Sequence, residues 1–132
     1  MILVDTSAWI EYDRATGSPI HHRVRAGIER SEPLATTGIV LLELLAGARD
    51  DEHSRELERL LARWSFIPLD ESCDYHMAAA IYRSCRLAGE TLRRVQDCLI
   101  AAVAMRVRAE LLHRDADFDA IARHAPLAIA RS

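Results

Sequence analysis

Short apolar runs alternate with amphipathic segments along the whole chain. Four runs predict buried strands, at residues 1–4, 34–37, 65–69 and 109–113, and residues 127–129 predict a last edge strand. Apolar residues three or four positions apart predict the helices between them. These are 8–12, 20–30, 38–48, one starting within 50–53, 73–87, 95–106 and a short one ending at 122. Such alternation favours a parallel α/β sheet with helices on both faces.

The first apolar run stops on an acid. Residues 1–4 are apolar on both faces, as suits a central parallel strand, and Asp5 follows them directly. The crevice beyond the carboxyl ends of such strands is where α/β proteins bind ligands. Thr6 or Ser7 is predicted to cap the next helix. Asp5 is therefore either a turn or cap residue or part of a functional site, and this run alone leaves both interpretations open.

Two helices that are otherwise almost wholly apolar each contain one acid. Glu43 lies in the middle of 38–48, which we expect to be buried on every side, and Asp97 lies near the start of 95–106. Burying an ionised carboxylate without a partner costs several kcal/mol at least. Glu43 could have an arginine partner or lie on an exposed edge, and Asp97 could simply complement the helix dipole. Otherwise both belong to a functional site.

A second strand delivers acids at its carboxyl end, because residues 109–113 run directly into Asp115 and Asp117. Acids converging in one crevice would repel one another strongly. Without matching basic residues in the same segments, they need a hard divalent cation, and carboxylate ligands select Mg²⁺ or Mn²⁺. The sequence contains no glycine-rich phosphate loop and no pattern typical of a serine or cysteine nucleophile. Metal-dependent phosphodiester hydrolysis is the chemistry that fits.

The composition is that of an ordinary soluble globular protein of one domain, 50% apolar and 28% charged over 132 residues. No apolar stretch is long enough for a membrane span and no signal peptide precedes the first strand, so we expect a cytoplasmic protein without a membrane partner. Three cysteines without a C-x-x-C pair and scattered histidines argue against a zinc site. All 17 basic residues are arginine.

Four segments in this order resemble the PIN domain, and more narrowly the VapC toxins of type II toxin–antitoxin modules. They are 2–7 (ILVDTS), 43–47 (ELLAG), 97–102 (DCLIAA) and 113–118 (HRDADF). The resemblance covers the whole chain, so residues 1–132 are expected to form a single PIN-like nuclease domain. It implies a PIN-like α/β/α sandwich with a short parallel sheet flanked by helices on both faces.

The resemblance also implies an Mg²⁺- or Mn²⁺-dependent endoribonuclease toxin that cleaves transfer or ribosomal RNA and so inhibits translation and growth. The catalytic acids it implies are Asp5, Glu43, Asp97 and Asp115. Those expected to hold the metal are Asp5, Asp97, Asp115 and Asp117. The implied partner is a cognate antitoxin whose C-terminal segment covers the acidic groove, often with an arginine at the acids. A homodimer or a toxin–antitoxin hetero-oligomer is expected.

Supporting residues surround these acids. Ser7 matches a position that commonly orients the site, and His113 stands where the family frequently has threonine, so its role is left open. Candidates for RNA phosphate contacts are Arg93, Arg94 and Arg114, because arginine binds phosphate bidentately. The net charge of −3 is compatible with RNA binding, since removing four site acids from 20 leaves 16 against 17 arginines.

Three alternative functions are considered. The chain could be a weakly catalytic or non-catalytic PIN-like protein that acts mainly as an antitoxin-binding module. It could also be a housekeeping PIN nuclease that processes RNA. A phosphatase with Asp5 as covalent nucleophile is disfavoured, because the D-x-D-x-T pattern is absent and the chain has no lysine.

Overall fold

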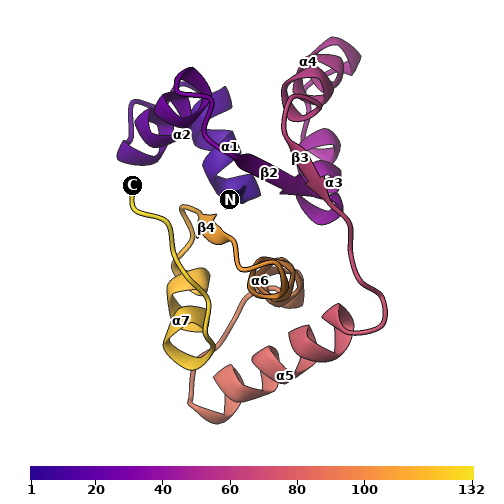
Figure 1. The fold of residues 1–132 in the computed structure, drawn as a ribbon, viewed down its shortest axis with the longest axis vertical. Helices are drawn as coiled ribbons and strands as arrows, with labels where there is room; N and C mark the ends of the chain where they lie inside the picture. Colours follow the sequence, from indigo (N-terminus) through magenta and orange to yellow (C-terminus); the bar gives the residue numbers. More distant parts are fainter.

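The computed structural model describes residues 1–132 as four strands and seven helices (Figure 1). The strands are β1 (Ile2–Val4), β2 (Leu34–Thr37), β3 (Ser65–Ile67) and β4 (Glu110–Leu112). The helices are α1 (Thr6–Asp13), α2 (Pro19–Glu29), α3 (Gly38–Ala46), α4 (Asp51–Leu61), α5 (Asp74–Leu87), α6 (Val95–Arg106) and α7 (Ala116–His124). The predicted alternation of strands and helices is confirmed.

The sheet has the strand order β3-β2-β1-β4, and every pair is parallel. β1 is central, with Ile2 paired to Leu34 on one side and to Glu110 on the other. All three residues of β1 are buried, as its apolar run predicted. Because the strands are parallel, their carboxyl ends meet at one edge, so whatever follows β1 lies beside whatever follows β4.

Helices cover both faces of the sheet, which confirms the predicted fold class. In Figure 1, α5, α6 and α7 lie on one side of the strands, and α1 and α2 lie on the other. α6 is the most deeply packed helix, with every residue from 97 to 104 buried. No helix is both long enough and apolar enough to cross a membrane.

The prediction that residues 38–48 form a helix buried on all sides is wrong. In α3 only Val40 and Leu44 are buried, and Leu42 is 66% exposed. α3 packs against α1, α4, β2 and α6, which leaves one side of the helix uncovered. Glu43 is therefore partly accessible, with 20% of its side chain exposed.

Three details, one at a helix cap and two at strands, also differ from prediction. Neither Asp70 nor Ser72 caps α5; its N-cap is Cys73, without a side-chain bond, while Asp70 Oδ1 accepts hydrogen bonds from the backbone N and Oγ of Ser72. The predicted edge strand 127–129 is reduced to one parallel bridge between Ile129 and Leu111. β3 also ends at Ile67, before Pro68, which has no N–H for a ladder.

Candidate active site

Asp5 caps a helix with one carboxylate oxygen, and its other oxygen has no partner. It is the N-cap of α1, and its Oδ2 accepts hydrogen bonds from the backbone N of Ser7 at 2.9 Å and from Ser7 Oγ at 2.6 Å. The predicted cap at Thr6 or Ser7 is therefore wrong. Asp5 Oδ1 is buried and has no hydrogen-bond partner. The cap interpretation of Asp5 is confirmed, and the unpartnered Oδ1 is compatible with its place in a functional site as well.

Asp115 repeats this arrangement at the end of β4. It is the N-cap of α7, and its Oδ1 accepts a hydrogen bond from the backbone N of Asp117 at 3.0 Å. Ser7 joins the two strand ends, since its Oγ also accepts a hydrogen bond from the backbone N of Arg114 at 2.9 Å. The parallel pairing of β1 with β4 therefore brings Asp5 and Asp115 to one edge of the sheet.

Two helices contribute the remaining acids. Asp97, in the first turn of α6, is 0% exposed; its Oδ1 accepts a hydrogen bond from Arg94 Nη2 at 3.1 Å and its Oδ2 has no partner. Glu43 on α3 accepts a hydrogen bond from Arg94 Nη1 at its Oε2, at 2.9 Å, and its Oε1 is buried without a partner. An arginine partner was one of the two alternatives for Glu43, and it is present here.

Three carboxylates converge closely. Each of Asp97, Asp115 and Asp117 has an oxygen that lies within 4.8 Å of the other two. Burial raises the pKa of Asp97 to about 7; the charge of Arg94 opposes this, and the nearby carboxylates, Asp5 first among them, add to it. Burial also raises the pKa of Asp5, against the hydrogen bonds from Ser7. The buried surroundings of Asp5 and Asp97 thus disfavour the charged form of both acids.

The three arginines proposed for RNA phosphate lie in different settings. Arg93 donates from Nη2 to Asp115 Oδ1 at 2.7 Å, and from Nε to Asp117 Oδ2 at 3.2 Å. Arg94 bridges Glu43 and Asp97, as described above. The Arg114 guanidinium instead pairs with Glu11, a residue that the sequence pattern did not single out. Two of the three candidates are therefore bonded to the site acids.

His113 holds the backbone next to the acids. Its Nδ1 accepts a hydrogen bond from the backbone N of Asp115 at 3.0 Å, and its Nε2 lies 3.3 Å from Asp119 Oδ1. Its ring packs on Phe118 at a centroid distance of 5.2 Å. Nδ1 is therefore used by the backbone, and the unpartnered atoms on the site acids are carboxylate oxygens. No spacing signal in the sequence pointed to Asp119.

These residues fit a divalent metal ion. Three carboxylate oxygens are buried without partners, on Asp5, Glu43 and Asp97, and such groups are rare in folded proteins unless a ligand or water satisfies them. An all-oxygen donor set is what Mg²⁺ and Mn²⁺ prefer. The largest cavity, about 480 Å³, lies between α5 and α6 beside Met105 and contains none of these acids. The candidate site is therefore identified by its unpartnered carboxylate oxygens and not by a large cavity.

Comparisons with known proteins show the family of this chain. The family model described as PIN domain matches residues 2–124. The chain is 49% identical over 124 residues to the VapC ribonuclease Mb1587 of Mycobacterium bovis and to ribonuclease VapC11 of Mycobacterium tuberculosis. These matches cover 93% of this chain and 92% of each relative.

Solved structures share the fold at lower sequence identity. VapBC2 from Rickettsia felis, bound to a promoter DNA fragment, matches with a TM-score of 0.76 at 20% identity, over 98% of both chains. VapBC-1 from nontypeable Haemophilus influenzae matches with a TM-score of 0.75 at 22% identity, over 98% of this chain and 97% of the other. By its family model and its close relatives, the chain belongs to the PIN domain family and is a relative of the VapC ribonucleases.

Proposed function

We propose that this protein is an endoribonuclease toxin of a type II toxin–antitoxin system and that it requires Mg²⁺ or Mn²⁺. The observation that carries the proposal is the set of three buried, unpartnered carboxylate oxygens beside the converging acids at the carboxyl edge of the sheet. The names of the relatives that are 49% identical, both ribonucleases, support RNA as the substrate.

The residues of the site would divide the work as follows. Asp5, Asp97, Asp115 and Asp117 would hold the cation, and Glu43 Oε1, which has no partner, would accept a hydrogen bond from the attacking water. When bound, a divalent cation lowers the pKa of a coordinated water and neutralises charge on phosphoryl oxygens. Ser7 and His113 would keep the two strand ends in register.

The reaction proposed is hydrolysis of a phosphodiester bond in transfer or ribosomal RNA. Water oxygen bonds to phosphorus and gives up a proton, and the bond from phosphorus to the 3′ oxygen breaks. That oxygen takes up a proton and leaves as a 3′-hydroxyl. The other product carries a 5′-phosphate. The ribose 2′-hydroxyl takes no part, so no 2′,3′-cyclic phosphate forms.

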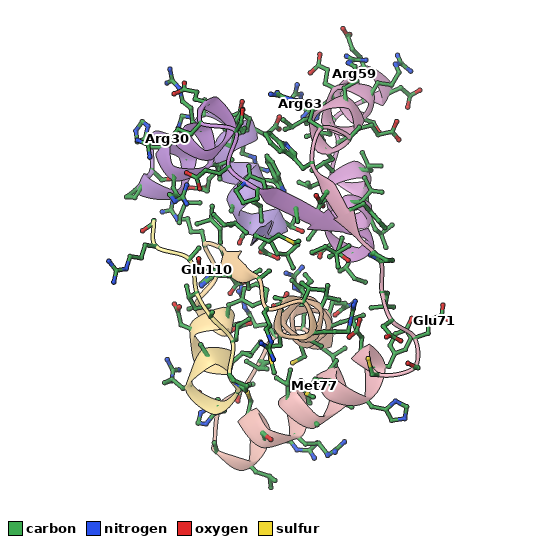
Figure 2. The ribbon with its side chains drawn as sticks, in the orientation of Figure 1. Arg30, Arg59, Arg63, Glu71, Met77 and Glu110 are labelled. Atoms are coloured by element: carbon green, nitrogen blue, oxygen red, sulfur yellow. The ribbon has the colours of Figure 1, made fainter.

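The test is cleavage of bulk transfer and ribosomal RNA by purified protein with Mg²⁺, with Mn²⁺ and with EDTA. We expect Asp5→Asn and Asp97→Asn to lower the cleavage rate by about 100-fold or more, since each removes a charge from the metal site. Glu71→Gln is the matched control, because Glu71 is an exposed acid on the loop before α5 (Figure 2). Undiminished cleavage in EDTA, or products ending in cyclic phosphate, would contradict the proposal.

The same assay separates the catalytic proposal from a binding function. Arg93 and Arg94 bond to site acids, which favours a protein with little intrinsic activity as the second candidate. If the parent and the two aspartate variants cleave RNA equally poorly with Mn²⁺, the antitoxin-binding module is the better description.

A cognate antitoxin is proposed as the partner, as in the VapBC complexes that share this fold. Its C-terminal segment would cover the acidic groove and place an arginine at the acids, within a homodimeric or hetero-oligomeric assembly. Co-purification with an antitoxin encoded beside the gene for this chain tests the partner. Loss of that complex on truncation of the antitoxin's C-terminal segment tests the groove.

A further inference from the structure

Arg93 and Arg94, adjacent in the chain, bond to most of the candidate site. Together they contact four of its five acids: Glu43, Asp97, Asp115 and Asp117. Only Asp5 has no arginine, and it is closed off by Ser7 on one oxygen. The site as it stands is thus partly neutralised by two guanidinium groups from its own chain, here called the arginine pair.

The arginine pair is held by its bonds to the acids more than by packing. The backbone is fixed on either side, by buried Leu92 before the pair and by the start of α6 at Val95 after it. The side chains themselves are 71% exposed for Arg93 and 46% exposed for Arg94. Rotation about side-chain bonds is therefore enough to release both guanidinium groups, without any change in the fold.

The arginine pair and a divalent cation compete for the same carboxylates. Asp97 and Glu43 each give one oxygen to Arg94, and the other oxygen of each is buried without a partner. A cation bound at those free oxygens would lie within a few ångströms of the guanidinium, where two positive charges repel strongly. Because a guanidinium is a planar fork suited to phosphate as well as carboxylate, it has an alternative partner on a nucleic acid.

We propose that the arginine pair is a movable counter-ion: it binds the acids in the metal-free protein and transfers to RNA phosphates once a divalent cation enters. This rests on the proposed function for the identity of cation and substrate. The consequence is an ordered assembly in which the metal ion frees the groups that grip the RNA. Arg93 and Arg94 would then weaken metal binding and strengthen RNA binding, two effects of opposite sign.

The first test measures Mn²⁺ affinity without RNA, by electron paramagnetic resonance of free Mn²⁺. We expect the double variant Arg93→Gln/Arg94→Gln to bind Mn²⁺ about tenfold more tightly than the parent, because the repulsion between the arginine pair and the cation is removed. A tenfold change corresponds to about 1.4 kcal/mol. Arg123→Gln is the matched control, an exposed arginine that also pairs with an acid, Glu90, outside the site. It should keep the parent affinity, and a double variant that also does so would overturn the proposal.

The second test distinguishes movement from a fixed electrostatic field. Affinity for a 15-nucleotide single-stranded RNA is measured by fluorescence anisotropy, once with Ca²⁺ in place of Mg²⁺ and once with EDTA. We expect the double variant to lose about tenfold in affinity with Ca²⁺ and less than about twofold with EDTA, because without metal the arginine pair is still bonded to the acids. Equal losses in both conditions would show that the arginines do not transfer and would overturn the proposal.

Failure of this inference can be told apart from failure of the proposed function. A parent that binds Mn²⁺ and cleaves RNA, with a double variant of unchanged Mn²⁺ affinity, overturns only the movable counter-ion. A parent that binds no Mn²⁺ overturns both.

Discussion

Asp74 and Asp97 are both buried aspartates in the first turn of a helix, α5 and α6 respectively, and each is bonded to an arginine. Their exposed fractions are 1% and 0%. On the sequence alone both suit the same interpretation, an acid that complements the helix dipole. The structure separates them by how many of their oxygens have partners.

Asp74 is saturated with donors. Arg106 Nε lies 3.0 and 3.2 Å from its two oxygens, Arg106 Nη2 lies 3.1 Å from Oδ2, and the backbone N of Asp70 donates to Oδ2 at 2.9 Å. Asp97 has one bond, to an arginine that it shares with Glu43, and one oxygen has none. We expect a buried acid that stabilises the fold to be fully bonded, and a buried acid that binds a ligand to be short of donors.

The largest expected effect tests Asp74. Asp74→Asn should lower the free energy of unfolding by about 3 kcal/mol, because it leaves Arg106 without its carboxylate in a largely buried pair. Urea unfolding in EDTA measures this. Glu29→Gln, which removes the acid of an exposed ion pair with Arg25, is the control and should change stability far less. Similar losses in the two variants would contradict the structural assignment of Asp74.

The second prediction concerns metal addition. Mn²⁺ at about 100 times its dissociation constant should stabilise the parent by about 2.7 kcal/mol, because the ion binds the native state only. The gain should persist in Asp74→Asn and be greatly reduced in Asp97→Asn. Thermal unfolding with and without Mn²⁺ measures it. A gain that survives Asp97→Asn in full would mean that the ion binds elsewhere.

Much of this contrast lies beyond what a sequence pattern can predict. The spacing of apolar residues predicted β1, α6 and the parallel sheet, because burial on one or both faces requires apolar residues at regular positions. Asp5, Glu43 and Asp97 could be singled out because each is a lone acid within or directly after an apolar run. Asp74 could not be assigned, since its partner Arg106 is 32 residues away and only tertiary packing brings them together.

Local capping was predicted less well. We expected Thr6 or Ser7 to cap α1 and Asp70 or Ser72 to cap α5, and both predictions were wrong. Several capping residues stand side by side in each segment, and their preferences differ by tenths of a kcal/mol to about 1 kcal/mol, too little to choose among neighbours.

The third prediction is a pH dependence of the metal-free protein. The pKa of Asp97 is near 3.8 in the unfolded chain and about 7 in the native state. Well below pH 3.8 the group is protonated in both states and contributes nothing. As pH rises from 4 to 7 the unfolded state loses its proton first, so native stability falls, and above 7 the full penalty applies.

Asp97→Asn removes that penalty and should therefore leave the metal-free protein at pH 8 more stable than the parent by about 1–2 kcal/mol, less than the full pKa shift because the bond to Arg94 is weakened. The difference should be smallest near pH 4. Urea unfolding in EDTA across pH 4–8 measures it. Marked destabilisation at pH 8 would make Asp97 an acid of the same kind as Asp74.

The smallest predicted effect uses two serines with almost identical geometry. Ser7 donates to Asp5 from its backbone N at 2.9 Å and its Oγ at 2.6 Å, and Ser72 donates to Asp70 from the same atoms at 3.0 and 2.6 Å. Asp5 is buried and Asp70 lies at the surface, where water replaces a lost donor. Ser7→Ala should therefore cost about 1 kcal/mol in EDTA at pH 8, and Ser72→Ala should cost less.

The serine pair also responds to pH in a way that separates it from simple packing. Without the Ser7 hydroxyl the pKa of Asp5, already raised by burial, should rise further, so that the cost of Ser7→Ala shrinks as pH falls and Asp5 becomes protonated. Urea unfolding of both alanine variants at pH 5 and pH 8 checks this. If the cost is equal at both pH values, Ser7 acts through packing and its bond with the backbone of Arg114. Its hydroxyl would then not stabilise the charged form of Asp5.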